Sequence, residues 1–198
     1  KARLMRAVLR GLGAVPIKRR HDHDGDSKPV DPDAKPVDND AAFDEIILTN
    51  QEHVGCESPW QLKAKRYGIY VKKVTVPVPP QNPQQLIDLF VNGTTPQTKV
   101  WAIPHLTSQL AIRFPVNELC RLARERGIIS VIDGAQCSGH LQLDLHAMGC
   151  DAYFSSPHKW LLAPQGCGFL YVNRERLPHL WGTIASGQWD NYHDGAYR

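Results

Sequence analysis

The stretch Ile128-Ile129-Ser130-Val131-Ile132, followed directly by Asp133, decides the fold of this chain. It is short, rich in β-branched side chains and almost wholly apolar, which is typical of a strand buried on both faces of a parallel sheet. A weaker strand pattern, Asp151-Ala152-Tyr153-Phe154, follows further along the chain. We therefore expect both segments to lie in one sheet whose faces are covered by helices.

Strand and helix patterns alternate along the rest of the chain. Further strands are predicted at 46–49, 71–76, 99–103 and 168–172, and helices at 59–67, 83–91 and 115–126. Pro115 at the start of the last helix and Gly127 beyond its end are common boundary residues. Because alternating strands and helices form βαβ units, the expected fold class is α/β, with a mainly parallel sheet flanked by helices.

Two chemically useful side chains stand at predicted strand ends. Asp133 follows the strand at 128–132, and Lys159 belongs to the run Ser155-Ser156-Pro157-His158-Lys159-Trp160 after the weaker strand. In open α/β sheets, ligands bind beyond the carboxyl ends of the strands, so we expect these two residues to face one site. A lysine amine can form a Schiff base with a pyridine aldehyde, and a carboxylate keeps the ring nitrogen protonated. This pair indicates pyridoxal 5'-phosphate (PLP).

Several ordered motifs resemble the large domain of fold type I PLP enzymes of the class V aminotransferase group, which includes cysteine desulfurases and isopenicillin N epimerase. The resemblance runs from about His53 to Gly187. It rests on Glu52-His53, Pro59-Trp60, His105-Leu106-Thr107-Ser108, Asp133-Gly134-Ala135-Gln136, Ser156-Pro157-His158-Lys159 and Gly166-Cys167-Gly168-Phe169-Leu170-Tyr171. Motifs in this order are far more specific than any one of them.

The resemblance implies a role for each residue of one cofactor site. Lys159 is expected to form the Schiff base, and Asp133 to pair with the pyridinium nitrogen. Gln136 is implied to bind the phenolic oxygen, and His53 to stack on the ring and assist proton transfer. The implied catalytic residues are thus Lys159, His53 and Asp133. The remaining cofactor-binding residues are Ser156 and His158, which hold the phosphate, and Ser108.

Taken singly, these residues have ordinary explanations. A lone aspartate after a strand is usually a turn or cap residue, and a lone lysine is usually a solvated surface charge. His53 is also compatible with an interior histidine whose hydrogen bonds are satisfied. The order in which the residues occur favours the functional interpretation for Asp133 and Lys159.

The motifs leave the reaction open. Transamination, epimerisation, β-elimination and desulfuration all begin with the same cofactor chemistry on an amino-acid-like substrate. Thr107-Ser108 and the segment 182–189 look more like the isopenicillin N epimerase branch than the desulfurases. The alternative is a truncated or degenerate domain that acts as a structural or interaction unit.

The chain divides into three predicted parts: an amino-terminal helix at 1–17, a flexible polar loop at 18–42 and a PLP-binding large domain at 43–198. Histidines and aspartates cluster in the loop, but Ser27 stands where a calcium loop needs glycine, so no metal site is predicted. Compared with the family, we expect a partial chain that lacks the smaller carboxyl-terminal domain and the usual phosphate-gripping loop before His53.

Composition fits an ordinary globular protein, with 198 residues, 42% hydrophobic and 22% charged. The net charge of +3 is small and spread out, which argues against a nucleic-acid partner. No apolar run approaches the roughly 20 residues that span a membrane.

The cysteines are odd in number and show no C-x-x-C spacing, which argues against a disulfide framework. Cys120 and Cys167 are expected to have packing roles. We expect a cytoplasmic protein, and the resemblance implies a homodimer.

Overall fold

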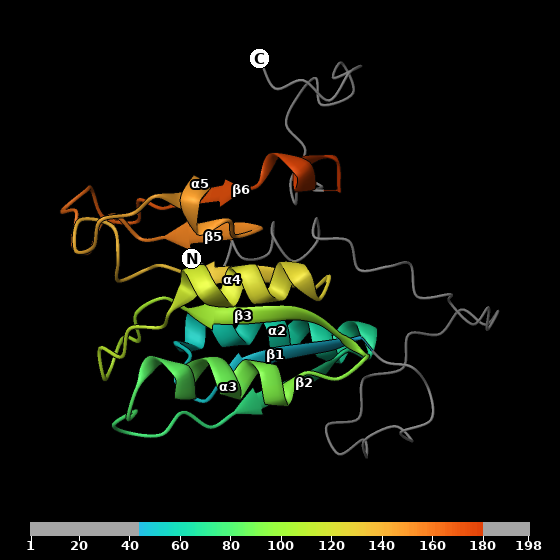
Figure 1. The fold of residues 1–198 in the computed structure, drawn as a ribbon. Coiled ribbons are helices and arrows are strands. Elements are labelled where there is room, and N and C mark those ends of the chain that lie inside the picture. Colours follow the sequence, from blue (N-terminus) through green and yellow to red (C-terminus); the bar gives the residue numbers. More distant parts are fainter. Residues whose placement is uncertain (1–43, 180–198) are drawn as a thin grey trace, which may run out of the picture.

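A computed structural model describes residues 44–179, so the predicted helix at 1–17 and loop at 18–42 lie outside the described residues (Figure 1). The described part contains one six-stranded sheet in the order β2-β1-β3-β4-β5-β6. Its strands are β1 (Glu45–Thr49), β2 (Tyr70–Val74), β3 (Thr98–Pro104), β4 (Ile129–Asp133), β5 (Ala152–Ser155) and β6 (Phe169–Val172). Strands β1 to β5 pair in parallel, and β6 pairs antiparallel with β5. The predicted α/β class with a mainly parallel sheet is confirmed.

Helices cover both faces of this sheet. They are α2 (Val54–Tyr67), α3 (Pro83–Gly93), α4 (Val116–Glu125), the single-turn α5 (Leu145–Met148) and the 3-10 helix η1 (Arg174–His179). Helix α2 lies on one face, whereas α3 and α4 lie on the other (Figure 1). The sequence analysis missed α5 and η1 because they are too short to show a helical period. Among the described helices, none is long and apolar enough to cross a membrane.

Alternate side chains of the strands build two separate cores. Ile47, Trp101 and Ile132 pack with α3 and α4, whereas Leu48 and Val131 pack on the opposite face with α2. Both sets are buried, which explains why the strand at 128–132 is almost continuously apolar. Each fully buried aliphatic or aromatic side chain contributes roughly 1.5–3 kcal/mol to folding. The sheet is therefore held by hydrophobic burial from both sides.

Helix α2 begins earlier than predicted. The sequence placed Pro59 at the helix start, but the helix begins at Val54 and contains Pro59 in its interior. The reason is an uncommon cap: the side chain of His53 accepts a hydrogen bond from the backbone N–H of Gly55 at 3.0 Å. Histidine is not among the residues usually expected at this position. The true start was therefore hidden from a search for ordinary cap residues.

A buried carboxylate ties β4 to the segment before β5. Asp151 Oδ2 accepts hydrogen bonds from the backbone N–H and the hydroxyl of Ser130, at 2.8 and 3.1 Å. Asp151 Oδ1 accepts from Nε of Arg176 in η1 at 2.7 Å. Ser130 is the one polar residue in the decisive apolar stretch, and this network accounts for its burial.

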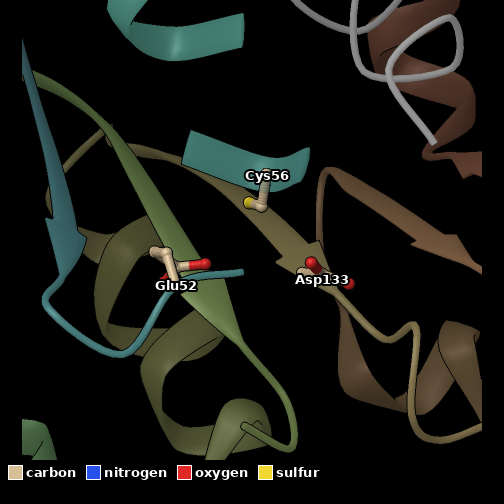
Figure 2. A group of neighbouring side chains, drawn as sticks. All are labelled: Glu52, Cys56 and Asp133. Carbon is tan, nitrogen blue, oxygen red and sulfur yellow. The ribbon is translucent and has the colours of Figure 1, made fainter. Parts of the chain in front are cut away.

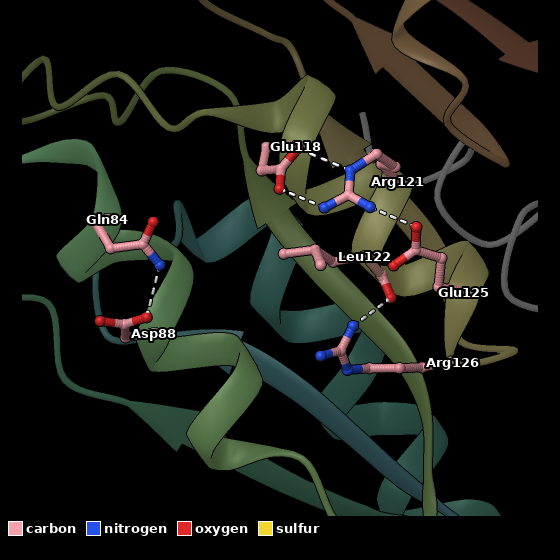
Figure 3. Close-up of polar contacts among 7 residues, drawn as sticks. All are labelled: Gln84, Asp88, Glu118, Arg121, Leu122, Glu125 and Arg126. Carbon is pink, nitrogen blue, oxygen red and sulfur yellow. Dashed lines mark hydrogen bonds and ion pairs between the residues drawn. The ribbon is translucent and has the colours of Figure 1, made fainter.

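The outer surface of α4 is polar, as expected for a helix with one face in water. Arg121 pairs with Glu118 and Glu125 on neighbouring turns, and Nη1 of Arg126 donates to the carbonyl of Leu122 at 3.0 Å (Figure 3). On α3, Gln84 Nε2 donates to Asp88 at 2.8 Å. Such exposed pairs add little stability because water competes for both partners.

We expect Asp151→Ala to lower the free energy of unfolding by about 3 kcal/mol, because it leaves the buried N–H of Ser130 unpaired and breaks the contact with Arg176. Urea denaturation followed by circular dichroism measures the change. The control is Asp88→Ala, which removes an exposed carboxylate and should change the free energy by less than about 0.5 kcal/mol. Equal losses in the two variants would contradict this role for Asp151.

Candidate functional site

The loops that follow β1, β3 and β4 meet at one edge of the sheet. The strand order reverses between β1 and β3, and in such α/β sheets the crevice at the reversal is the usual ligand site. A small pocket lies there, lined by Gln51, His53, Pro104, Leu106, Thr107, Ser108, Asp133, Ala135 and Gln136. The structure thus brings four predicted site residues together: His53, Ser108, Asp133 and Gln136.

Asp133 occupies the carboxyl end of β4 and is 6% exposed. Its Oδ1 accepts a hydrogen bond from the backbone N–H of Ala135 at 2.9 Å. Its backbone carbonyl accepts from the N–H of His105 at 2.9 Å, which links it to the end of β3. These contacts fix a buried carboxylate beside the pocket, at the strand end where the sequence analysis placed it.

Glu52 is the residue that the sequence analysis overlooked. It was noted within the motif Glu52-His53 but was given no role. Figure 2 shows Glu52, Cys56 and Asp133 grouped around one space. One carboxyl oxygen of Glu52, one of Asp133 and the sulfur of Cys56 all lie within 4.8 Å of one another. The only available signal was its position beside His53, because its burial depends on the fold of the loop after β1.

The Glu52 carboxyl group is buried although the residue as a whole is half-buried. Its Oε1 accepts from the hydroxyl of Thr49 at 3.1 Å, whereas Oε2 is buried and has no hydrogen-bond partner within residues 44–179. Burial, and then the charge of Asp133, raise the pKa of Glu52 to about 8, while the Cys56 thiol and Thr49 partly offset the rise. Glu52 is therefore mainly neutral at pH 7.

His53 lies exposed at the pocket, where its Nδ1 caps α2 by accepting from Gly55. This bond fixes the ring orientation, and it requires that a neutral ring carry its proton on Nε2. Ser108 is also exposed, in the loop after β3. That loop is held by Thr107, whose hydroxyl oxygen accepts from the N–H of Ile112 at 2.9 Å.

Lys159, Ser156 and His158 lie in the turn after β5 and do not line the pocket. Lys159 donates its backbone N–H to the carbonyl of Ser156 at 3.0 Å. His158 Nδ1 lies 2.8 Å from the carbonyl oxygen of Cys167, to which it donates. The turn adjoins the pocket because Nε1 of Trp160 donates to Oε1 of Gln136 at 2.9 Å.

A close backbone contact supports this junction. Gly139 has φ +81°, and an added Cβ would lie 2.7 Å from the Cα and N of Leu161. Next to it, the rings of His140 and Trp160 stack with their centroids 4.4 Å apart. The segment after Asp133 and the segment after Lys159 therefore touch where only glycine fits.

Buried aromatic groups lie beneath the turn that begins at Asp133. His105 Nδ1 lies 3.1 Å from the hydroxyl of Tyr153, and an added Cβ on Gly134 would lie 1.9 Å from Cζ of Tyr153. Burial, and then the charge of Arg113, lower the pKa of His105 to about 4, so its ring is neutral at pH 7. Burial raises the pKa of Tyr153 well above its usual range. Both groups therefore act as neutral supports.

The described cysteines divide by burial. Cys120 is buried, as expected, and Cys56, Cys137 and Cys150 are buried as well. The packing expected for Cys167 is wrong, because this residue is exposed in the turn before β6. The expectation rested on a predicted turn flanked by glycines, but the chain enters the edge strand only at Phe169.

A larger cleft of about 630 Å³ lies beside the start of α4 and is lined by residues such as His105, Arg113, Glu118, Gln142 and Asp144. None of the predicted site residues lines it. The smaller pocket is lined by predicted site residues, so we take it as the candidate site.

The family described as "Aminotransferase class-V" matches residues 39–191. Isopenicillin N epimerase of Streptomyces clavuligerus is 38% identical over 142 residues, which cover 72% of this chain and 36% of that protein. A probable cysteine desulfurase of Xylella fastidiosa is 37% identical over 156 residues, which cover 74% of this chain and 34% of that protein. The chain thus spans about a third of the length of these relatives.

Solved structures give the same picture. The cysteine desulfurase CsdA of Escherichia coli matches with a TM-score of 0.67 at 26% identity, covering 74% of this chain and 36% of that chain. A C-DES mutant with glycine covalently linked to the PLP cofactor matches with a TM-score of 0.65 at 28% identity, covering 70% and 37%.

We expect Gly139→Ala to lower the free energy of unfolding by roughly 2–4 kcal/mol, because it combines a left-handed backbone with a collision against Leu161. Urea denaturation measures the loss. Gly166→Ala is the matched control, since Gly166 has φ +83° but nothing within 4 Å of an added Cβ. The control should lose only about 1–2 kcal/mol. If both variants lose the same amount, the close approach contributes nothing.

Proposed function

Because the chain belongs to the class-V aminotransferase family, we propose that it forms the cofactor-bearing part of a PLP-dependent enzyme. The enzyme acts on the amino group or the α-carbon of an amino-acid-like substrate. The observation that carries the proposal is the shared pocket of His53, Asp133 and Gln136, which adjoins the turn of Lys159. Relatives that are named as an epimerase and as cysteine desulfurases support it.

The residues present fit PLP. The pocket offers a nearly buried carboxylate at Asp133, an imidazole at His53 and an amide at Gln136, and the adjoining turn supplies the amine of Lys159. A buried carboxylate is costly unless it meets a cation or hydrogen-bond donors. A pyridinium ring supplies both a positive charge and an N–H donor, so the donor set matches the cofactor.

Asp133 is proposed to face the ring nitrogen. When bound, PLP supplies an electron sink for negative charge that develops at the substrate α-carbon. A neighbouring carboxylate favours the protonated ring nitrogen, which strengthens that sink. The Ala135 N–H holds the Asp133 carboxylate in place for this task.

Lys159 and His53 are proposed to handle protons. Lys159 would hold the cofactor through Nζ, and the same amine would accept or return the α-proton. His53 would lie against the cofactor ring, and its capping bond leaves Nε2 as the atom that can donate or accept a proton.

The other site residues are proposed to orient the cofactor. Because Oε1 of Gln136 accepts from Trp160, its NH₂ group is the part left to bind the phenolic oxygen. Ser156 and His158 bind the phosphate, and Ser108 supplies a further hydroxyl from the loop after β3. Within the family we favour the isopenicillin N epimerase-like branch, and we also propose a cytoplasmic homodimer.

We expect PLP to become fixed to Lys159 when a mixture of chain and cofactor is reduced with borohydride, because reduction makes the bond between an amine and an aldehyde permanent. Peptide mass spectrometry locates the label. Lys159→Ala should lose the label, whereas Lys99→Ala, which changes an exposed lysine of β3, should keep it. A label on any other lysine would overturn the assignment.

We expect Asp133→Asn to retain PLP but to slow exchange of a substrate α-proton with deuterium by about 10²–10³-fold, as loss of about 3–4 kcal/mol of electrostatic stabilisation implies. Proton NMR in heavy water, with L-alanine and L-cysteine as probes, measures this exchange, which all four candidate reactions share. Asp88→Asn removes an exposed charge and should exchange at the rate of the unmodified chain. Near-normal exchange in Asp133→Asn would show that Asp133 does not face the ring.

A further inference from the structure

Two carboxyl groups, rather than one, lie at the proposed position of the cofactor ring nitrogen. Glu52 enters from the loop after β1, and Asp133 ends β4, with Cys56 from the first turn of α2 beside them (Figure 2). In Figure 2 the Glu52 carboxyl group points toward the space between Cys56 and Asp133. The role assigned to Asp133 does not explain why a second acid is buried there.

The Glu52 and Asp133 carboxyl groups lie close together. One oxygen of Glu52 lies within 4.8 Å of one oxygen of Asp133. Two carboxylates this close repel each other strongly in a poorly solvated setting, so one of them stays protonated.

The proton resides on Glu52. Asp133 Oδ1 accepts a hydrogen bond from the backbone N–H of Ala135, and Glu52 Oε1 accepts one from the hydroxyl of Thr49, but the buried Oε2 of Glu52 has no hydrogen-bond partner within the described residues. The titratable groups that face Glu52 are Asp133 from β4, the Cys56 thiol from α2 and its neighbour His53, whose Nδ1 is bonded to Gly55. Within the described part, no lysine or arginine is among the groups that lower the pKa of Glu52.

We propose that Glu52 is a positioning residue for the cofactor ring: it holds a proton beside Asp133, and so leaves Asp133 alone to pair with the ring nitrogen. This inference rests on the proposed function. In it Glu52 acts through Asp133 and not on the reacting atoms.

The charge of a bound cofactor ring would change the pKa of Glu52. A ring cation that pairs with Asp133 cancels the charge that helps to keep Glu52 protonated, so the pKa of Glu52 falls from about 8 on binding. Binding therefore releases protons near neutral pH. The affinity is lowest below the bound-state pKa, rises with pH between the two pKa values and is constant above about pH 8. A fall of about one pKa unit corresponds to about a tenfold gain in affinity.

The test is calorimetric titration of the full chain with pyridoxamine 5'-phosphate, which cannot form the covalent bond to Lys159. Titrations at pH 6, 7 and 8 in two buffers of different ionisation enthalpy give both affinity and protons released. Glu52→Gln keeps the size of the side chain and an acceptor for Thr49. The control is Glu125→Gln on the exposed surface of α4.

We expect the unmodified chain and Glu125→Gln to release protons and to bind up to about tenfold more tightly at pH 8 than at pH 6, beyond any change seen in Glu52→Gln. Protons released by the ligand itself are the same in every variant, so they drop out when proton release is compared between variants. Equal proton release and equal pH dependence in Glu52→Gln would overturn the proposal.

Infrared spectroscopy of the cofactor-free chain separates this proposal from the proposed function. A protonated-carboxyl band at pH 7 should be missing in Glu52→Gln and present in Glu125→Gln. If the chain binds no pyridoxamine 5'-phosphate at any pH, the proposed cofactor is wrong, while the band still decides whether Glu52 holds the proton. A band that persists in Glu52→Gln would refute the assignment of the proton, whatever the chain binds.

Discussion

Parallel pairing of β1, β3, β4 and β5 is the constraint on which the rest of the structure depends. It brings the carboxyl ends of strands that are far apart in the chain to one edge, where each loop contributes a different functional group. A parallel sheet must be covered on both faces, and here α2 covers one face while α3 and α4 cover the other. The positions of the functional groups at this edge thus depend on the apolar core that holds the sheet together.

The same burial that holds the sheet also sets the charges beside the pocket. Water is largely excluded there, so groups that would titrate freely on the surface become neutral: the pKa of Glu52 rises and the pKa of His105 falls. The Asp133 carboxyl group accepts a hydrogen bond from the backbone N–H of Ala135. A site of this kind selects a ligand with a localised positive charge, which is what a protonated pyridine offers.

The sequence predicted what depends on local pattern. The strands, helices α3 and α4, and the position of Asp133 at a strand end follow from apolar periodicity and from the composition at 128–132. The start of α2 was wrong because its cap is a histidine, and Cys167 was wrong because exposure at a sheet edge leaves no mark on local sequence. The pairing of Glu52 with Asp133 joins residues from different loops, so it depends on tertiary structure alone.

The antiparallel pairing of β6 with β5 has a consequence for how such a protein can change over evolutionary time. Ser155 pairs with Phe169, so the segment between them is a closed loop whose ends the sheet fixes. Lys159 lies near the first end, whereas Leu161 and Leu162 further along are exposed. Trp160 and Leu161 are held by contacts with Gln136 and Gly139, but because each doubling of loop length costs only about 0.6 kcal/mol, residues can be inserted beyond Leu162 at little cost. The length of this loop can thus change between related proteins while the lysine stays in place.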